Sequence, residues 1–274
     1  MDPAFADLVI GRRPQRLEYA WIGTADRGAP VIVFLHEGLG SLAMWKDFPD
    51  NLCAAAGARG LVFSRYGHGH STPRPAAEKW PVDFMHAQAE EVLPALFARL
   101  QLDDPPWLLG HSDGASIALL YAAAHAERVA GLVAVAPHVF VEDVSVASIE
   151  KARVAYAGTD LKRRLARYHD DPDSAFHGWN DVWLDPAFRD WNIESCLPRI
   201  HCPVLAVQGE DDEYGTMAQI DAIARLVPQA RLLKLPACGH SPHRDQPLAL
   251  TEAVVALLNE HRQVPVRSAM TARS

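Results

Sequence analysis

The stretch PPWLLGHSDGASIALLYAAA, residues 105–124, carries the signal that decides the fold. Its centre, GHSDG at 110–114, fits the pattern G-x-S-x-G with Ser112 in the middle. A short apolar run precedes it and predicts a buried strand, and small helix-favouring residues follow it and predict a helix. A strand, a tight turn with serine at its apex and a helix form the context that this pattern requires. The flanking glycines let the strand and the helix approach closely while the serine backbone is strained.

The rest of the chain predicts strands that alternate with helices. Continuous apolar runs, typical of strands buried on both faces, occur at Val31–Leu35, 60–64, 107–109, 129–136 and 204–207, and a further strand is expected at Ala230–Leu235. Because this alternation implies parallel crossovers, we expect an α/β fold with a doubly wound, mostly parallel sheet.

Outside these runs, the pattern predicts three helices, one further strand and a tail. Helices are expected at 44–57, at 82–100 with a kink at Pro94, and at 247–261. Residues 15–23 alternate between apolar and polar, which predicts an antiparallel edge strand. The last residues, 263–274, are expected to form a frayed tail.

Residues 141–198 interrupt the alternation because they contain no good buried strand. They hold helical patterns at 146–156 and 161–168 and then an aromatic cluster of Phe176, Trp179, Trp183, Phe188 and Trp191. A long aromatic insertion without strands predicts a helical lid over a pocket, and the alternative is an ordinary packed helical layer. We therefore expect a core at 1–140 and 199–274, with a helical cap at 141–198 inserted before the strand expected at 204–207.

Composition excludes several classes of function. The chain has 274 residues, of which 49% are hydrophobic, so it can build one large core. A net charge of −8 argues against nucleic acid or an anionic membrane as the main partner. No apolar run is long enough to span a bilayer, and the N-terminus lacks a basic segment followed by a long apolar one. The expected location is cytoplasmic.

Cysteine and histidine spacing predicts no metal and no cofactor. None of the four cysteines lies in a C-x-x-C pair, which favours free thiols in a reducing compartment: Cys53, Cys196, Cys202 and Cys238. The pairs His68-x-His70 and His240-x-x-His243 lack the companions and helical spacing of a metal site. No dinucleotide fingerprint follows the first buried strand.

With these motifs in place, the chain resembles the α/β-hydrolase fold family over nearly its full length. That family places a catalytic triad in the chain order serine, acid, histidine. The resemblance implies that Ser112 is the nucleophile and that His240, in PACGHSP at 236–242, is the base. His240 follows the last predicted strand and precedes the last helix, whereas the competing His243 lies further from the strand end.

The acid is expected in QGEDDE at 208–213, directly after a buried strand. The family pattern puts the acid three residues after the glycine, which favours Asp212 and leaves Asp211 as the alternative. Its task would be to fix the tautomer of the histidine and to stabilise the imidazolium.

The resemblance also implies an oxyanion hole of two backbone N–H groups. One belongs to Asp113, and the other belongs to HEGLGS at 36–41. Most relatives have His-Gly-x there, whereas this chain has Glu37 in place of the glycine. Alignment on the histidine gives Gly38 as the donor, and a shift of one residue gives Leu39.

Several neighbouring residues receive structural expectations from the same family layout. YGHGHST at 66–72 resembles the Gly-His-Gly-x-Ser loop of the family, and its histidines are expected to be structural and to pack near the oxyanion loop. Glu37 is expected to form a buried ion pair with Arg65, and His111 to pack against the serine turn.

The implied activity is that of a serine hydrolase that cleaves a small carboxylic ester, thioester or lactone. The aromatic insertion indicates a substrate with an apolar or aromatic part, with His138, Trp179 and Trp183 as candidate contacts. The same triad also fits a carbon–carbon hydrolase of ring-cleavage products of the 2-hydroxy-6-oxo-dienoate type, or a lyase or acyltransferase. A ligand receptor or scaffold would lack a triad member, and all three are present. Serine at position 112 excludes the haloalkane dehalogenases and epoxide hydrolases of this fold, which use aspartate.

Overall fold

The computed structural model describes residues 2–261, and their centre is one eight-stranded sheet of order β1-β2-β4-β3-β5-β6-β7-β8. β2 pairs antiparallel with both β1 and β4, and every other neighbouring pair of strands is parallel. The strands are β1 (Ala4–Ile10), β2 (Arg13–Gly23), β3 (Val31–Leu35), β4 (Arg59–Phe63), β5 (Trp107–His111), β6 (Gly131–Val135), β7 (Val204–Gly209) and β8 (Ala230–Leu235). This architecture confirms the predicted α/β class and the mostly parallel sheet.

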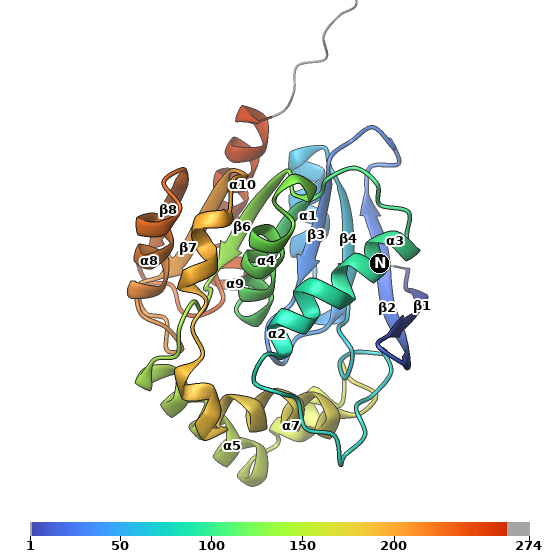
Figure 1. Ribbon diagram of the computed structural model, residues 1–274, viewed down its shortest axis with the longest axis vertical. Coiled ribbons are helices and arrows are strands. Elements are labelled where there is room, and N and C mark those ends of the chain that lie inside the picture. The colour runs from blue at the N-terminus through green and yellow to red at the C-terminus, as the bar shows by residue number, and fades with distance from the viewer. Residues whose placement is uncertain (1, 262–274) are drawn as a thin grey trace, which may run out of the picture.

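Helices cover both faces of the sheet (Figure 1). In β3, Val33 and Leu35 belong to one hydrophobic cluster and Ile32 and Phe34 to the other, which explains the continuous apolar run of that strand. One face packs against α1 (Phe48–Ala56) and α10 (Pro247–Glu260), and the other against α3 (Leu93–Arg99), α4 (Asp113–Ala124) and α8 (Ala218–Leu226).

Residues 15–23 form an antiparallel strand as predicted, but it is an inner strand, so the predicted edge position was wrong. It forms most of β2, which pairs with β1 from Ala4↔Tyr19 to Ile10↔Arg13 as well as with β4. The two strands form a hairpin whose turn begins at Gly11, with φ of 59°. β1 is the true edge, and its half-exposed, weakly alternating side chains did not stand out in the sequence.

The expected helices at 82–100 and 44–57 are both interrupted. The first consists of α2 (Phe84–Ala87), a π-helical turn (Gln88–Val92) and α3. Pro94 has no N–H to donate to the carbonyl one turn earlier, so the regular α ladder cannot run through this point, and the predicted kink takes the form of a π turn just before it. The second consists of a 3₁₀ turn (Leu42–Trp45) followed by α1.

The chain between β6 and β7 is helical and lies at one end of the sheet (Figure 1). It contains α5 (Asp143–Gly158), α6 (Leu161–Leu165), α7 (Pro172–Trp183) and two 3₁₀ segments (Pro186–Asp190 and Glu194–Arg199). Its β pairing consists of one isolated bridge between Phe140 and Asn192. Within residues 2–261, no helix combines the length and apolar composition needed to cross a bilayer. The tail expected at 263–274 falls outside the described residues.

Gly114→Ala is expected to lower the free energy of unfolding by at least about 2 kcal/mol, because small-to-large changes in tight backbone contacts force the main chain apart. A Cβ at Gly114 would overlap the carbonyl group of Leu35. Gly158→Ala is the matched control, because a Cβ there meets nothing within 4 Å and the change is expected to be neutral or slightly stabilising. Urea unfolding of both variants measures the difference, and equal stabilities would contradict this account of the turn.

Candidate active site

Ser112 occupies the sharp turn between β5 and α4. Its backbone has φ of 53° and ψ of −121°, a region in which a residue with a Cβ is strained. A Cβ at Gly110 would overlap the backbone of Gly114, so both glycines of the pattern are needed for strand and helix to approach each other. The turn presents Ser112 at the N-terminus of α4, where the helix dipole favours negative charge.

His240 lies in the loop after β8 and is bound to Asp212, which follows β7. Its Nδ1 is 2.9 Å from both Oδ1 and Oδ2 of Asp212. The carboxylate is completely buried, and it also accepts hydrogen bonds from the N–H of Tyr214 (2.8 Å) and from Gln208 Nε2 (2.6 Å). Burial raises the pKa of Asp212, but the hydrogen bond from His240 and the Tyr214 N–H outweigh it, so the pKa is lowered overall.

The charge of Asp212 determines the tautomer of His240. A carboxylate accepts and cannot donate, so the proton of a neutral His240 ring is on Nδ1, and Nε2 is left with a free lone pair. Asp211, the alternative acid, is exposed, and its backbone N–H donates to the carbonyl of Cys238 at 2.9 Å. The structure therefore brings Asp212, and not Asp211, to the histidine.

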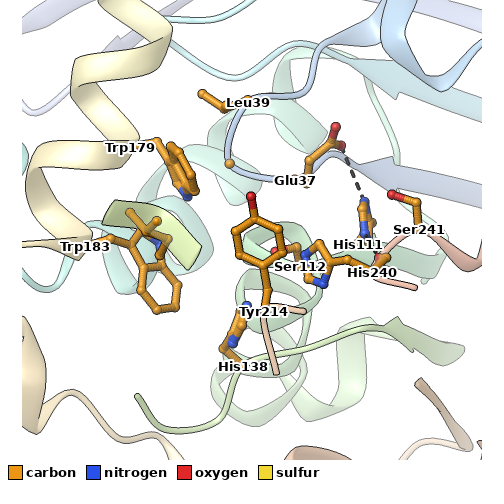
Figure 2. A pocket seen from close by; sticks show the side chains of 12 residues that line it. Glu37, Leu39, His111, Ser112, His138, Trp179, Trp183, Tyr214, His240 and Ser241 are labelled. Carbon is orange, nitrogen blue, oxygen red and sulfur yellow. Dashed lines mark hydrogen bonds and ion pairs between the residues drawn. The ribbon is translucent and has the colours of Figure 1, made fainter. Parts of the chain in front are cut away.

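Ser112 and His240 line the same cavity, which has a volume of about 580 Å³ including its open part. Figure 2 shows their side chains next to each other, beside the ring of Tyr214. The walls combine loops of the core with two aromatic residues of α7: the lining consists of Glu37, Gly38, Leu39, His111, Ser112, His138, Ile149, Trp179, Trp183, Tyr214, His240 and Ser241. The three candidate contacts from the sequence, His138, Trp179 and Trp183, are among them.

The loop after β3 has its carbonyl groups held by histidines. His68 Nε2 is 2.8 Å from the carbonyl oxygen of Gly38, and His169 Nε2 is 3.1 Å from that of Leu39. Burial lowers the pKa of both rings, so they are neutral and donate through one nitrogen. His68 was expected to be structural, whereas His169 comes from the helical insertion and was not singled out in the sequence.

Three backbone N–H groups of the loop after β3 and of the serine turn are free to bind a ligand. Among residues 2–261, the N–H groups of Gly38, Leu39 and Asp113 donate to no protein acceptor. The indole ring of Trp179 lies directly on Gly38, so a Cβ at this position would overlap it and only glycine fits. Gly38 thus reaches the cavity wall through its backbone.

The expected ion pair between Glu37 and Arg65 is not formed. Arg65 Nη2 donates to the backbone carbonyl of Glu37 at 2.8 Å and lies 3.9 Å from Oδ2 of Asp113. Asp113 is completely buried, and Trp183 Nε1 donates to its Oδ1 at 3.1 Å. Burial raises the pKa of Asp113, and the guanidinium of Arg65 opposes this rise. The positive charge of Arg65 is therefore directed at the Asp113 carboxylate beneath the serine turn rather than at Glu37.

The Glu37 carboxylate instead approaches Nδ1 of His111, at 3.5 Å (Figure 2). It also lies 3.7 Å from Nη2 of Arg244. His111 Nε2 donates to the carbonyl oxygen of His240 at 2.7 Å. His111 was expected only to pack against the serine turn, but it also ties that turn to the loop of His240.

His243, the competing base, is buried away from the cavity lining. Its ring packs against Trp45, with ring centroids 4.9 Å apart, and against His111, at 4.8 Å. Burial lowers the pKa of His243 to about 2, with His111 and Arg244 adding to the decrease and Glu37 opposing it. The ring is neutral and belongs to the core beside α1.

His243→Phe is expected to make the protein less sensitive to acid. Its folded pKa of about 2 lies below the unfolded value near 6.5, so below pH 6.5 only the unfolded chain takes up this proton and stability falls. One such group contributes a slope of about 1.4 kcal/mol per pH unit, which the substitution removes. Urea unfolding between pH 6 and pH 4 measures the slope, with His201→Phe at an exposed histidine as control. An unchanged slope in His243→Phe would contradict the neutral, buried ring.

The cysteines and possible metal ligands of the described chain show no further centre. All four cysteines are free and buried. Residues 2–261 contain no group of three or more histidine, cysteine, aspartate or glutamate side chains arranged to hold a metal ion. Tyr214, Ile149 and Ser241 complete the cavity without having been predicted from the sequence. Of these, Tyr214 had a signal, because it lies two residues after the expected acid.

The family model described as "Alpha/beta hydrolase family" matches residues 32–254. The chain therefore belongs to the α/β-hydrolase family and is an enzyme.

Curated relatives include Serine hydrolase BPHL of Homo sapiens, 29% identical over 189 residues that cover 65% of this chain and 61% of that protein. The chain thus spans less than two thirds of this human relative. Proline iminopeptidase of Thermoplasma volcanium is 24% identical, with 81% of this chain and 86% of that protein covered.

Solved structures with the same fold include a thermophilic esterase from Thermogutta terrifontis, with a TM-score of 0.70, 21% identity and coverage of 96% of this chain and 100% of the other. The enol-lactonase from Burkholderia xenovorans LB400 has a TM-score of 0.69 and 23% identity, and the match covers 92% of this chain and 99% of the other. At these identities the likeness shows the shared fold.

Proposed function

We propose that this enzyme hydrolyses a small carboxylic ester, thioester or lactone through an acyl-enzyme on Ser112. The observation that carries the proposal is a single cavity lined by two groups. One is a serine held in a strained turn, and the other is a histidine whose Nδ1 is bound to a buried carboxylate. The names of the relatives, which include a serine hydrolase and an esterase, support the same class of reaction.

In the first step, the lone pair on Nε2 of His240 takes the proton of the Ser112 hydroxyl while Oγ attacks the substrate carbonyl carbon. The π electrons of the carbonyl move to its oxygen, which becomes an oxyanion. Asp212 remains ionised and stabilises the imidazolium that forms, because its pKa is lowered in the folded protein.

The oxyanion is stabilised by the free N–H groups of Gly38 and Asp113. Donors that are already fixed in place towards the developing charge each contribute about 3 kcal/mol to lowering the barrier. The carbonyl groups of Gly38 and Leu39 are held by His68 and His169, which keeps the loop from turning. We assign the second donor to Gly38, with Leu39 as the alternative.

Collapse of the tetrahedral intermediate breaks the bond to the leaving oxygen or sulfur, which receives the proton from His240 Nε2. A water molecule then enters, gives its proton to His240 and attacks the acyl carbon. The second intermediate collapses, the bond to Ser112 Oγ breaks, and the hydroxyl regains its proton from the imidazolium. The products are a carboxylic acid and an alcohol or thiol, or one hydroxy acid from a lactone.

The helical segment 141–198 supplies the roof of this site and acts as a lid on the core formed by residues 2–140 and 199–261. Trp179 and Trp183 come from α7, and Ile149 comes from α5. With His138 they form a largely aromatic wall, which suits a small substrate with an apolar or aromatic part.

Charge favours this reaction over carbon–carbon hydrolysis of a ring-cleavage product. A 2-hydroxy-6-oxo-dienoate carries a carboxylate, which a binding site normally meets with arginine or lysine. The lining of the cavity includes neither, and its carboxylate, Glu37, would repel the substrate. An uncharged ester meets no such repulsion.

A substrate panel tests the proposal. The panel consists of p-nitrophenyl butyrate, a butyryl thioester, a butyrolactone and a 2-hydroxy-6-oxo-dienoate. We expect the enzyme to hydrolyse at least one of the first three with a kcat/KM at least tenfold above that of the dienoate. Ser112→Ala serves as the blank for each compound. A faster reaction with the dienoate would replace the proposal by carbon–carbon hydrolysis, and turnover of esters by Ser112→Ala would refute the acyl-enzyme.

A further inference from the structure

His138 is held in the cavity by its backbone. It follows β6, and its N–H donates to Ser116 Oγ at 3.1 Å, while the Ser116 hydroxyl donates to its carbonyl oxygen at 2.6 Å. The next N–H, that of Val139, donates to Gln219 Oε1 at 2.7 Å. Ser116 lies one turn after Ser112 on α4, so the position of His138 is fixed relative to the nucleophile.

The ring of His138 is buried, with 2% of the residue exposed, yet the described part of the chain offers it no polar partner. Its edge-on neighbour is Trp183, with ring centroids 4.8 Å apart, and the ring of His240 lies at 6.0 Å. Neither ring nitrogen forms a hydrogen bond with any of residues 2–261, and Nδ1 is fully buried without a partner. A buried polar group of this kind is unfavourable unless a ligand completes it.

The His138 imidazole is neutral at neutral pH. Burial lowers the pKa of His138 to about 3, with His240 and His111 adding to the decrease and Asp212 opposing it. The ring therefore offers one N–H donor and one lone pair. A neutral ring does not attract a carboxylate, and no arginine or lysine lines the cavity.

Tyr214 adds a second polar group without a protein partner. Its ring lies 4.7 Å from that of His240, and among the described residues its hydroxyl forms no hydrogen bond. Figure 2 shows Tyr214 between His138 and the opposite wall of Trp179 and Glu37. Two neutral hydrogen-bonding groups thus lie in the pocket that Ser112 and the aromatic residues Trp179 and Trp183 also line.

We propose that His138 selects the substrate, and that this substrate is an uncharged ester whose acyl or alcohol part carries a hydroxyl or carbonyl oxygen. The oxygen completes the hydrogen bonding of the His138 ring. This inference rests on the proposed ester hydrolysis and narrows its substrate class from hydrocarbon esters to oxygenated ones. A site built to hydrogen-bond a substrate group rejects the analogue that lacks it far more strongly than an apolar pocket rejects a missing methylene.

Two pairs of esters, in which a hydroxyl replaces a methyl group, test this class. The acyl pair is p-nitrophenyl 3-hydroxybutyrate and p-nitrophenyl 3-methylbutyrate, and the alcohol pair is 2-hydroxypropyl butyrate and 2-methylpropyl butyrate. We expect the wild-type enzyme to prefer the hydroxylated member of at least one pair by about tenfold or more in kcat/KM. His138→Phe should bring that ratio close to one, and His138→Gln, which keeps a donor and an acceptor, should retain part of it. His201→Phe, the same change at an exposed histidine outside the cavity lining, should keep the full ratio.

The possible failures are distinguishable. Hydrolysis of both pairs without a preference, or a preference that survives in His138→Phe, overturns the role of His138 and leaves the proposed function in place. Absence of turnover of every ester, together with no labelling of Ser112 by a fluorophosphonate, overturns the proposed function and this inference with it. Labelling of Ser112 also reports whether each variant is folded. If a variant does not fold, the kcat/KM ratio of the wild-type enzyme for each ester pair still tests the substrate class.

Discussion

Ser112→Ala is expected to lower kcat on p-nitrophenyl butyrate by about 10⁴-fold or more, because removal of the nucleophile leaves only the binding pocket and the oxyanion donors. Ser112 lies in the turn at the N-terminus of α4, and its side chain is next to that of His240 (Figure 2). Steady-state rates with purified enzyme measure the loss.

Stability provides the control for this variant. Alanine keeps the Cβ and the same φ of 53°, and within residues 2–261 the hydroxyl of Ser112 donates no hydrogen bond to the protein. The free energy of unfolding should therefore stay within about 1 kcal/mol of wild type. A variant that is folded and retains a tenth of the activity would show that the hydroxyl is not the nucleophile.

Asp212→Asn is expected to lower kcat by about 10³- to 10⁴-fold, because an amide in this place favours the wrong tautomer of His240. The NH₂ group would donate to Nδ1, the ring proton would move to Nε2, and Nε2 would no longer accept the proton of Ser112. Asp211→Asn is the matched control. Asp211 is exposed and makes its known contact through its backbone N–H, so its rate should stay within about threefold of wild type.

The two variants make the same change from carboxylate to amide at adjacent positions, so a difference between their rates reports the role of one carboxylate. Equal losses would indicate that the loop, rather than one carboxylate, is required. A larger loss in Asp211→Asn would assign the acid to the residue that the geometry leaves in solvent.

The sequence predicted the central part of the fold because its signals are local. The strands that became β3 to β7 are buried on both faces, so a continuous apolar run suffices to find them. The serine turn is equally local, since the glycines at 110 and 114 are required by contacts within the turn and with β3. The edge strand β1 was missed because only Ala6 and Leu8 are buried within it.

The details of the site depend on contacts between distant segments, which a single sequence does not show. His169 accepts a hydrogen bond from the N–H of Gly69, a hundred residues earlier in the chain, and supports Leu39. The ion-pair partner of Arg65 was predicted wrongly for the same reason. Pattern alone could not show that its guanidinium extends beneath the serine turn to the buried Asp113 and that Glu37 turns towards His111.

The most direct test of the account is to identify the residue that a fluorophosphonate labels. Tandem mass spectrometry of the labelled, digested protein should find one adduct per chain, on Ser112. His240→Ala should slow that labelling by about a hundredfold or more, because a serine hydroxyl without its base is a poor nucleophile. An adduct on another residue, or labelling of Ser112 at the same rate without His240, would contradict the claim that these two side chains work as one unit.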